Sequence, residues 1–134
     1  MRRAVLAGLV VSLTGCGLQI QSADLFLLTR TGQGGHRLTL LVSDGGTVTC
    51  NRRITRTLPG PLLLQARDLA NSLNSDATAH LNIPSRPGSV FRYAIRVQNG
   101  TVSFPDTAGT RHPTLARVEL FALQTARQVC RLTG

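Results

Sequence analysis

Apolar and polar residues alternate with a period of two on either side of the dipeptide Asn99-Gly100. This period is typical of strands that bury one face, and Asn-Gly between two such stretches favours a two-residue hairpin turn. We therefore predict an antiparallel hairpin in which Val97 lies opposite Val102 and Ile95 lies opposite Phe104. The apolar side chains of both strands would then share one face.

Three more strands are predicted earlier in the chain. They are expected at Leu25–Arg30, Arg37–Ser43 and Thr47–Cys50, with glycine-rich turns between them at residues 32–35 and 44–46. An Asp-Gly pair in the second of these turns is a strong hairpin signal, because turn residues must tolerate positive φ. The dense apolar run in the first strand predicts burial on both of its faces. The residues after the third strand, Arg52–Thr57, predict a basic loop.

Two longer stretches have apolar residues at helical spacing. The first begins after Pro59-Gly60-Pro61, since proline suits the first turn of a helix. Its apolar positions are Leu62, Ala66, Leu69 and Leu73. A second short turn is expected over Ala77–Leu81. The longest helix is predicted from His112-Pro113 to Val129, and its broad apolar stripe consists of Leu115, Val118, Phe121, Ala122, Leu123, Ala126 and Val129.

The order of these elements is strand–strand–strand–helix–strand–strand–helix, which predicts an α+β fold. We expect an antiparallel sheet of about five strands with both helices packed on one face. Residues 24–134 are predicted to form this single globular domain.

The first residues have the features of a secretory signal. A positive start, Met1-Arg2-Arg3, precedes an apolar run, Ala4–Ser12, that is too short to span a bilayer. The next four residues, Leu13-Thr14-Gly15-Cys16, resemble the lipobox of bacterial lipoproteins. An ordinary secretory signal, or an apolar helix that contains a cysteine, is the alternative interpretation.

The lipobox resemblance implies a diacylglyceryl thioether on Cys16, cleavage before it, and acylation of the new amino terminus with a fatty acid such as palmitate. Residues 1–15 would then be the signal peptide and 16–23 a lipidated tether. Two or more acyl chains hold a protein stably on a membrane. The expected location is therefore the outer face of the cell membrane, with no transmembrane helix in the mature protein.

The remaining cysteines form an even pair. With Cys16 lipidated, Cys50 and Cys130 remain in an oxidising compartment, and we predict a disulfide between them. It would close a loop of about 80 residues and stabilise the fold by roughly 4 kcal/mol in the chain-entropy model.

The charge of the chain is strongly positive. Without the signal, 13 arginines stand against six acidic residues, a formal charge of +7. This suits anionic partners such as wall polymers, although a GC-rich genome also favours arginine over lysine. The candidate binding residues are Arg52, Arg53, Arg56, Arg92 and Arg96. Nucleic acid is disfavoured as a partner by the exported location and by the five aromatic residues, which suggest no stacking platform.

Residues for catalysis or for metal binding are scarce. His36, His80 and His112 are dispersed, and the two distant thiols show no metal-ligand spacing. No serine has the Gly-x-Ser-x-Gly setting of a hydrolase nucleophile, and no two carboxylates share a motif. We predict a non-enzymatic binding module of the cell envelope, without cofactor or metal, whose partner is an envelope protein or an anionic wall polymer.

Two resemblances bear on this prediction. The segments DLFLLTRTG, LTLLVSDGGTVTCN, LLLQARDLA, PGSVF, NGTVSFPD and ELFALQ resemble a family of small actinobacterial lipoproteins. That family has no established activity, so this resemblance supports the location alone.

A weaker resemblance is to the subtilisin-inhibitor-like family. It is carried by Thr49-Cys50 at a strand end, the Leu/Ala-rich helix and the hairpin around Asn99-Gly100. It implies protease inhibition through an exposed loop, Asn82–Ser89. The family has two local disulfides, one of which staples the inhibitory loop, and this chain lacks cysteines at those places. An unstapled loop is expected to be cut as a substrate sooner than it inhibits.

Overall fold

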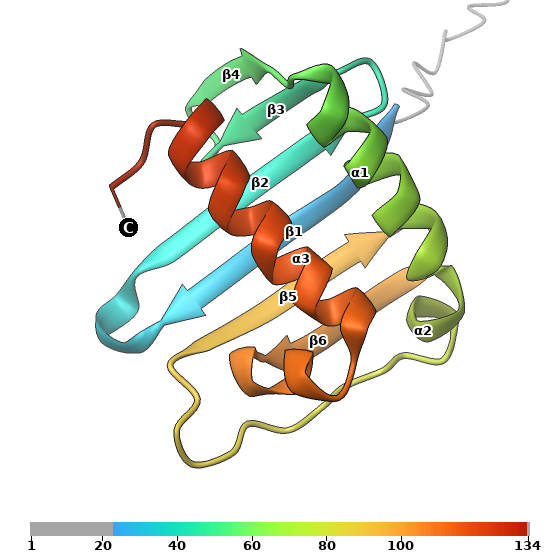
Figure 1. Cartoon of the computed structure of the whole chain (residues 1–134), viewed down its shortest axis with the longest axis vertical. Helices are drawn as coiled ribbons and strands as arrows, with labels where there is room; N and C mark the ends of the chain where they lie inside the picture. Colours follow the sequence, from blue (N-terminus) through green and yellow to red (C-terminus); the bar gives the residue numbers. More distant parts are fainter. Residues whose placement is uncertain (1–22, 134) are drawn as a thin grey trace, which may run out of the picture.

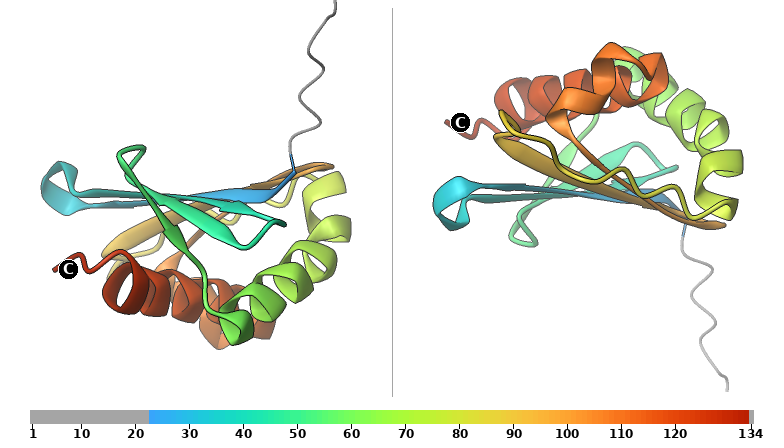
Figure 2. Two further views of the ribbon diagram at one scale, coloured as in Figure 1. Left: turned by 90° about the horizontal axis from the view of Figure 1, so that it is seen from above. Right: turned by 90° about the horizontal axis from the view of Figure 1, so that it is seen from below.

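A computed structural model describes residues 23–133 as one antiparallel sheet with helices on one face (Figures 1 and 2). The strand order is β4-β3-β2-β1-β5-β6. The strands are β1 (Asp24–Gly32), β2 (Arg37–Ser43), β3 (Thr47–Cys50), β4 (Ile54–Thr57), β5 (Phe91–Val97) and β6 (Gly100–Pro105). The helices are α1 (Gly60–Ser72), α2 (Asn74–Thr78) and α3 (Pro113–Gln124), with short helical turns η1 (Gln33–Gly35), η2 (Asp106–Thr110) and η3 (Thr125–Val129). The predicted α+β class is confirmed. The predicted signal peptide and lipobox, and the tether up to Ser22, lie outside the described residues.

The sixth strand, β4, lies where a basic loop was predicted, so that prediction was wrong. Ile54 pairs with Cys50 and Thr57 with Thr47. Three of the four residues of β4 are β-branched, which favours a strand. The strand nevertheless has no buried residue, because it forms the edge of the sheet beyond the helices. A hydrophobic pattern could therefore not reveal it.

Strand β1 is buried on one face only, contrary to the prediction of burial on both. Phe26 and Leu28 are fully buried beneath the helices, whereas Leu27 and Thr29 on the other face are partly exposed. The ring of Phe26 meets that of Phe121 on α3 edge-on, with centroids 5.6 Å apart. The helices cover one face of the sheet, and the opposite face has no second layer in the described chain (Figure 2).

The β5–β6 hairpin forms, but its register differs by two residues from the predicted one. Ile95 lies opposite Val102, and Tyr93 lies opposite Phe104. The turn residues are Gln98 and Asn99, while Gly100 already belongs to β6. The reason is the close approach of α2: a Cβ on Gly100 would lie 2.4 Å from the carbonyl oxygen of Ala77. A shift of two residues leaves every side chain on its face, so the alternating pattern fits both registers.

The helices largely follow their predicted stripes. Leu62, Ala66, Leu69 and Leu73 are buried, as the spacing predicted. The short helix α2 begins directly after α1, rather than at Ala77. Helix α3 continues through η3 to Val129. Leu123, assigned to the buried stripe, is 37% exposed instead.

A cysteine pair ties the end of η3 to the sheet. Cys50 and Cys130 form the predicted disulfide, with their Cα atoms 5.9 Å apart. Both residues are buried. Within residues 23–133, no helix has the length and apolar content needed to cross a membrane.

Candidate functional site

The face of the sheet turned away from the helices is its largest uncovered surface (Figure 2). One row of paired residues crosses all six strands on this face: Thr55, Thr49, Leu41, Leu27, Arg96 and Thr101. Further threonines and arginines on this face are Thr29, Thr31, Arg37, Thr47, Thr57 and Arg92. The six strands contain five arginines and a single acidic residue, Asp24. Two of the arginines, Arg30 and Arg56, are in register with buried Leu38 and Val48 and so lie on the helix side of the sheet. We call the surface turned away from the helices the open face.

The five arginines predicted to bind a ligand do not form one site. Arg52 and Arg53 lie in the β3–β4 turn and Arg56 lies on β4, whereas Arg92 and Arg96 lie on β5. Strands β3, β2 and β1 separate β4 from β5. At the usual spacing between strands, the two groups are about 19 Å apart.

Arg92 is occupied inside the fold. One nitrogen of its guanidinium donates to the carbonyl oxygen of Ile83 (3.0 Å) and to the hydroxyl of Ser85 (3.2 Å). The other donates to Oδ1 of Asn82 (2.6 Å) and to the hydroxyl of Ser103 (3.2 Å). These bonds hold the segment before β5 against the sheet, and they leave Arg92 a structural role.

The turn that carries Arg52 and Arg53 is held in a defined conformation. Asn51 and Arg52 both have positive φ, 49° and 58°. The backbone N–H of Asn51 donates to the carbonyl of Thr39 (2.7 Å), and Oδ1 of Asn51 accepts from the N–H of Thr39 (2.9 Å). The neighbouring Cys50 is fixed by its disulfide. Both arginines therefore project from a fixed tip.

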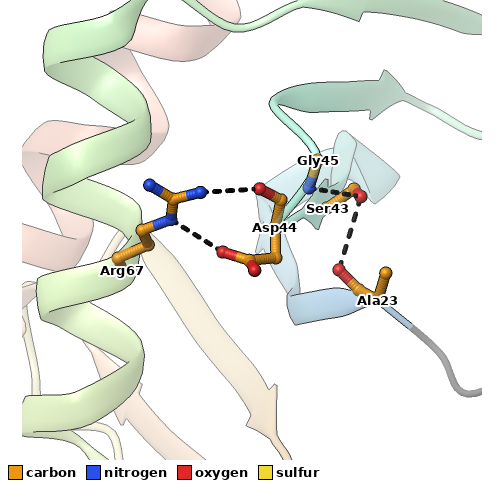
Figure 3. Close-up of polar contacts among 5 residues, drawn as sticks. All are labelled: Ala23, Ser43, Asp44, Gly45 and Arg67. Atoms are coloured by element: carbon orange, nitrogen blue, oxygen red, sulfur yellow. Dashed lines mark hydrogen bonds and ion pairs between the residues drawn. The ribbon is translucent and has the colours of Figure 1, made fainter.

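The chain joins the sheet at Ala23 (Figure 3). The carbonyl of Ala23 accepts from the backbone N–H of Asp44 (2.6 Å) and from the hydroxyl of Ser43 (3.3 Å). Arg67 of α1 in turn donates to the side chain of Asp44 (2.7 Å) and to its carbonyl (2.9 Å). A pocket of 580 Å³ lies beside this junction and is lined by Ala23, Asp24, Leu25, Phe26, Leu27, Leu41, Arg96, Val97 and Gln98.

Two more pockets lie at the opposite end of the sheet, where β1 and β6 finish and β2 and β5 begin. The first, which we call the Arg127 pocket, has a volume of 140 Å³, and its basic lining residues are Arg30, His36, Arg37 and Arg127. The second, which we call the Arg86 pocket, has a volume of 380 Å³, and its basic lining residues are Arg86, Arg111 and His112. Neither pocket has an aspartate or glutamate among its described lining residues.

Most of these basic residues were not singled out from the sequence. They come from β1, β2, η3, the loop before β5 and the segment after η2, so no contiguous motif connects them. The available signal was positional, because Arg37 begins a predicted strand and Arg86 lies in the loop before the predicted hairpin. Only the antiparallel pairing of β1 with both β2 and β5 brings these two places to one end of the sheet.

The three histidines and the carboxylates form no common site. His36, His80 and His112 are all exposed. Among residues 23–133, no three His, Cys, Asp or Glu side chains are grouped so that they could hold a metal ion. Asp106 accepts hydrogen bonds from the backbone N–H groups of Val90 (3.1 Å) and Phe91 (3.2 Å).

Glu119 on α3 is the most perturbed acid of the described chain. Its Oε1 is buried without a hydrogen-bond partner. Burial, reinforced by the charge of Asp106, raises the pKa of Glu119 from 4.5 to about 7. Burial also raises the pKa of Tyr93, with the charge of Glu119 adding to the effect. The carboxyl group of Glu119 lines none of the three pockets described above.

Comparison with known proteins adds no identification. No protein-family model, no curated protein and no solved structure matches this chain. The resemblances to small actinobacterial lipoproteins and to the subtilisin-inhibitor-like family therefore stay predictions.

Proposed function

We propose that this chain is a non-enzymatic binding module of the cell envelope, anchored to the outer face of the membrane by lipid on Cys16. Its partner in this proposal is an envelope protein or an anionic wall polymer.

The observation that carries this proposal is the uncovered open face. A six-stranded sheet with helices on one face leaves a broad surface of hydroxyl and guanidinium groups without a second layer. Threonine and arginine can donate hydrogen bonds to polar or anionic partners. The dispersed, exposed histidines support a role without acid–base chemistry, because a general base must lie within reach of the group that it activates.

The lipid anchor is tested by mass spectrometry of the mature protein from its native host. The proposal expects a first residue, Cys16, that carries a diacylglyceryl group and an amide-linked fatty acid. An intact amino terminus, or an unmodified Cys16, would remove the membrane from the proposal.

Binding through the open face is tested by co-sedimentation of the purified protein with isolated cell walls at low and high salt. Arg96→Gln removes a positive charge from the open face and should weaken the salt-sensitive binding. Asn71→Asp makes the same change in net charge at an exposed position in α1, outside the strands, and should leave binding unchanged. Equal binding by the two variants would refute a role for the open face.

Protease inhibition is a second candidate, and the bracing of the loop before β5 favours it. Pro84, Ser85, Arg86, Pro87 and Gly88 are exposed. The Arg92 guanidinium holds Asn82, Ile83 and Ser85 on one side of this stretch, and the hydroxyl of Ser89 accepts from the backbone N–H of Arg86 (3.2 Å) on the other. An inhibitory loop resists cleavage when it is held rigidly, and these bonds do part of what a disulfide would do.

Subtilisin progress curves test this second candidate. An inhibitor slows turnover and stays intact, and Arg86→Ala should abolish the effect. Arg92→Lys, which keeps the charge but loses the planar fork, should turn the loop into a substrate cut between residues 82 and 89. Arg96→Lys, two residues further along β5, is the matched control. Rapid cleavage of the unmodified protein would end this candidate.

A further inference from the structure

The Arg127 and Arg86 pockets define a basic end of the molecule. They lie where β1 finishes beside the start of β2, and where β6 finishes beside the start of β5. The junction at Ala23 lies at the other end of β1. A strand of nine residues is about 30 Å long, so the basic end is separated from the junction by about that length.

Four of the five arginines at this end have no side-chain partner within the described part of the chain. The exposed side chains of Arg37, Arg86, Arg111 and Arg127 make no hydrogen bond or ion pair there. Elsewhere, Arg67 pairs with Asp44 and Arg117 pairs with Asp68. The basic end therefore contains guanidinium groups whose donors are free for an external anion.

The two nearest acids, Asp106 and Glu119, form no ion pair with the arginines of this end within the described part of the chain. The carboxylate of Asp106 is engaged by two backbone N–H groups at the start of β5. Glu119 packs against Gly109 with one oxygen buried, and it lines neither pocket. Arg30, at the rim of the Arg127 pocket, stacks on the ring of Phe91 with 4.6 Å between its Cζ and the ring centroid. That contact holds one cation in place beside the pocket.

We infer that the basic end binds a linear polymer with repeated phosphate groups, one phosphate in each pocket. Arginine presents a planar fork of donors that matches the oxygens of a phosphate. Two separate basic pockets suit an anion that repeats along a chain, because binding at one pocket raises the effective concentration at the other. This inference deepens the proposed binding function and rests on it.

The lining of the pockets also limits the kind of polymer. Neither pocket has a phenylalanine or tyrosine among its described lining residues. Binding of single-stranded nucleic acid draws on stacking of bases on aromatic rings. The aromatic rings among the described lining residues are those of His36 and His112, one in each pocket. We therefore choose a polymer without bases as the occupant, and the test below includes an oligonucleotide.

The test measures binding of fluorescent inorganic polyphosphate to the full chain purified in detergent, over a range of salt concentrations. The expected result is affinity at least about tenfold higher than for orthophosphate, with a salt dependence that reflects the phosphates contacted. The double variant Arg86→Gln and Arg127→Gln removes one guanidinium from each pocket. It should weaken binding by about tenfold or more and lower the salt slope by about two.

The matched control is the double variant Asn71→Asp and Ser75→Asp, which changes the net charge by the same amount on α1 and α2, near the start of β6 and away from the basic end. It should change affinity by less than about twofold and leave the salt slope unaltered. All four side chains are exposed and make no hydrogen bond or ion pair within the described part of the chain, so unchanged thermal unfolding is expected for both variants.

Three outcomes would overturn the inference. Equal loss in the two double variants would mean that net charge alone attracts the polymer. Polygalacturonate binding as tightly as polyphosphate would show that phosphate is not recognised. An oligonucleotide with the same number of phosphates that binds more tightly would point to bases as ligands. Each outcome leaves the cell-wall and Cys16 experiments untouched, so failure of this inference is distinguishable from failure of the proposed function.

Discussion

Replacement of Glu119 by glutamine should make the stability of the fold less dependent on pH. One carboxylate oxygen is buried without a hydrogen-bond partner, and the pKa of Glu119 is raised from 4.5 to about 7. A rise of this size corresponds to a cost of roughly 3 kcal/mol for the charged form. Because the side chain is only partly buried, solvent screening reduces this to about 1–2 kcal/mol.

The sign follows from the raised pKa. A group whose pKa is higher in the folded state stabilises the fold below its unfolded pKa and loses that contribution as the pH rises through its folded pKa. The free energy of unfolding of the wild type should therefore fall by about 1–2 kcal/mol between pH 4.5 and pH 8 on account of Glu119. The glutamine variant has no such loss, so it should match the wild type near pH 4.5 and exceed it at pH 8.

Denaturant unfolding at a series of pH values gives the free energy of unfolding of the wild type and of Glu119→Gln. The test is the difference between these two free energies at each pH. The other groups near Glu119, Tyr93, Asp106 and Arg30, are present in both proteins and cancel to first order. Asp76→Asn, which removes a negative charge from α2, is the charge control. A difference curve that stays flat from pH 4.5 to pH 8 would show that Glu119 is solvated in the folded state.

Three other predictions test the packing. Reduction of the Cys50–Cys130 pair, or its replacement by two alanines, should lower the free energy of unfolding in guanidinium by up to about 4 kcal/mol. An unchanged midpoint of the unfolding curve would show that the disulfide does not stabilise the fold by restricting the unfolded chain. Gly100→Ala should cost about 2–4 kcal/mol, because the added Cβ meets the Ala77 carbonyl at 2.4 Å, whereas Gly60→Ala meets nothing within 4 Å and should be tolerated. A double-mutant cycle should give about 0.5–1 kcal/mol of coupling between Tyr93 and Phe104, whose ring centroids lie 5.2 Å apart in a stacked arrangement. Stronger coupling of Phe104 to Ile95 would instead support the register predicted from Asn99-Gly100.

The periodicity of the sequence revealed the elements that bury a face. Leu62, Leu69 and Leu73 were placed correctly because each turn of α1 presents an apolar residue to the sheet. The cysteine pair could be predicted because, once Cys16 is assigned to the predicted lipid anchor, only one intramolecular pairing is left for the other two thiols. The first argument needs only the spacing of apolar residues within one segment, and the second needs only the number of cysteines in the chain.

The features that were missed depend on contacts between residues far apart in the sequence. The alternating pattern fits two hairpin registers that differ by two residues. The contact that distinguishes them is the close approach of the α2 backbone to Gly100, which the pattern does not contain. Strand β4 has no buried face, and three of its four residues are polar, as in a loop, while its one apolar residue, Ile54, is exposed. The basic end gathers residues as distant as Arg30 and Arg127, and the chain order gives no sign that they line one pocket.

The position of the basic end connects the proposed lipid anchor with the inferred polymer binding. A lipid on Cys16 would hold the Ala23 junction toward the membrane, because the intervening tether, residues 17–22, spans at most about 20 Å. The Arg127 and Arg86 pockets would then face away from the bilayer, about 30 Å further out. Free arginines beside an anionic membrane would be held by lipid headgroups, whereas at the distal end they are available to a polymer. Moving the anchor to the carboxyl terminus, which lies near the Arg127 pocket, should therefore weaken polyphosphate binding on vesicles without changing it in detergent.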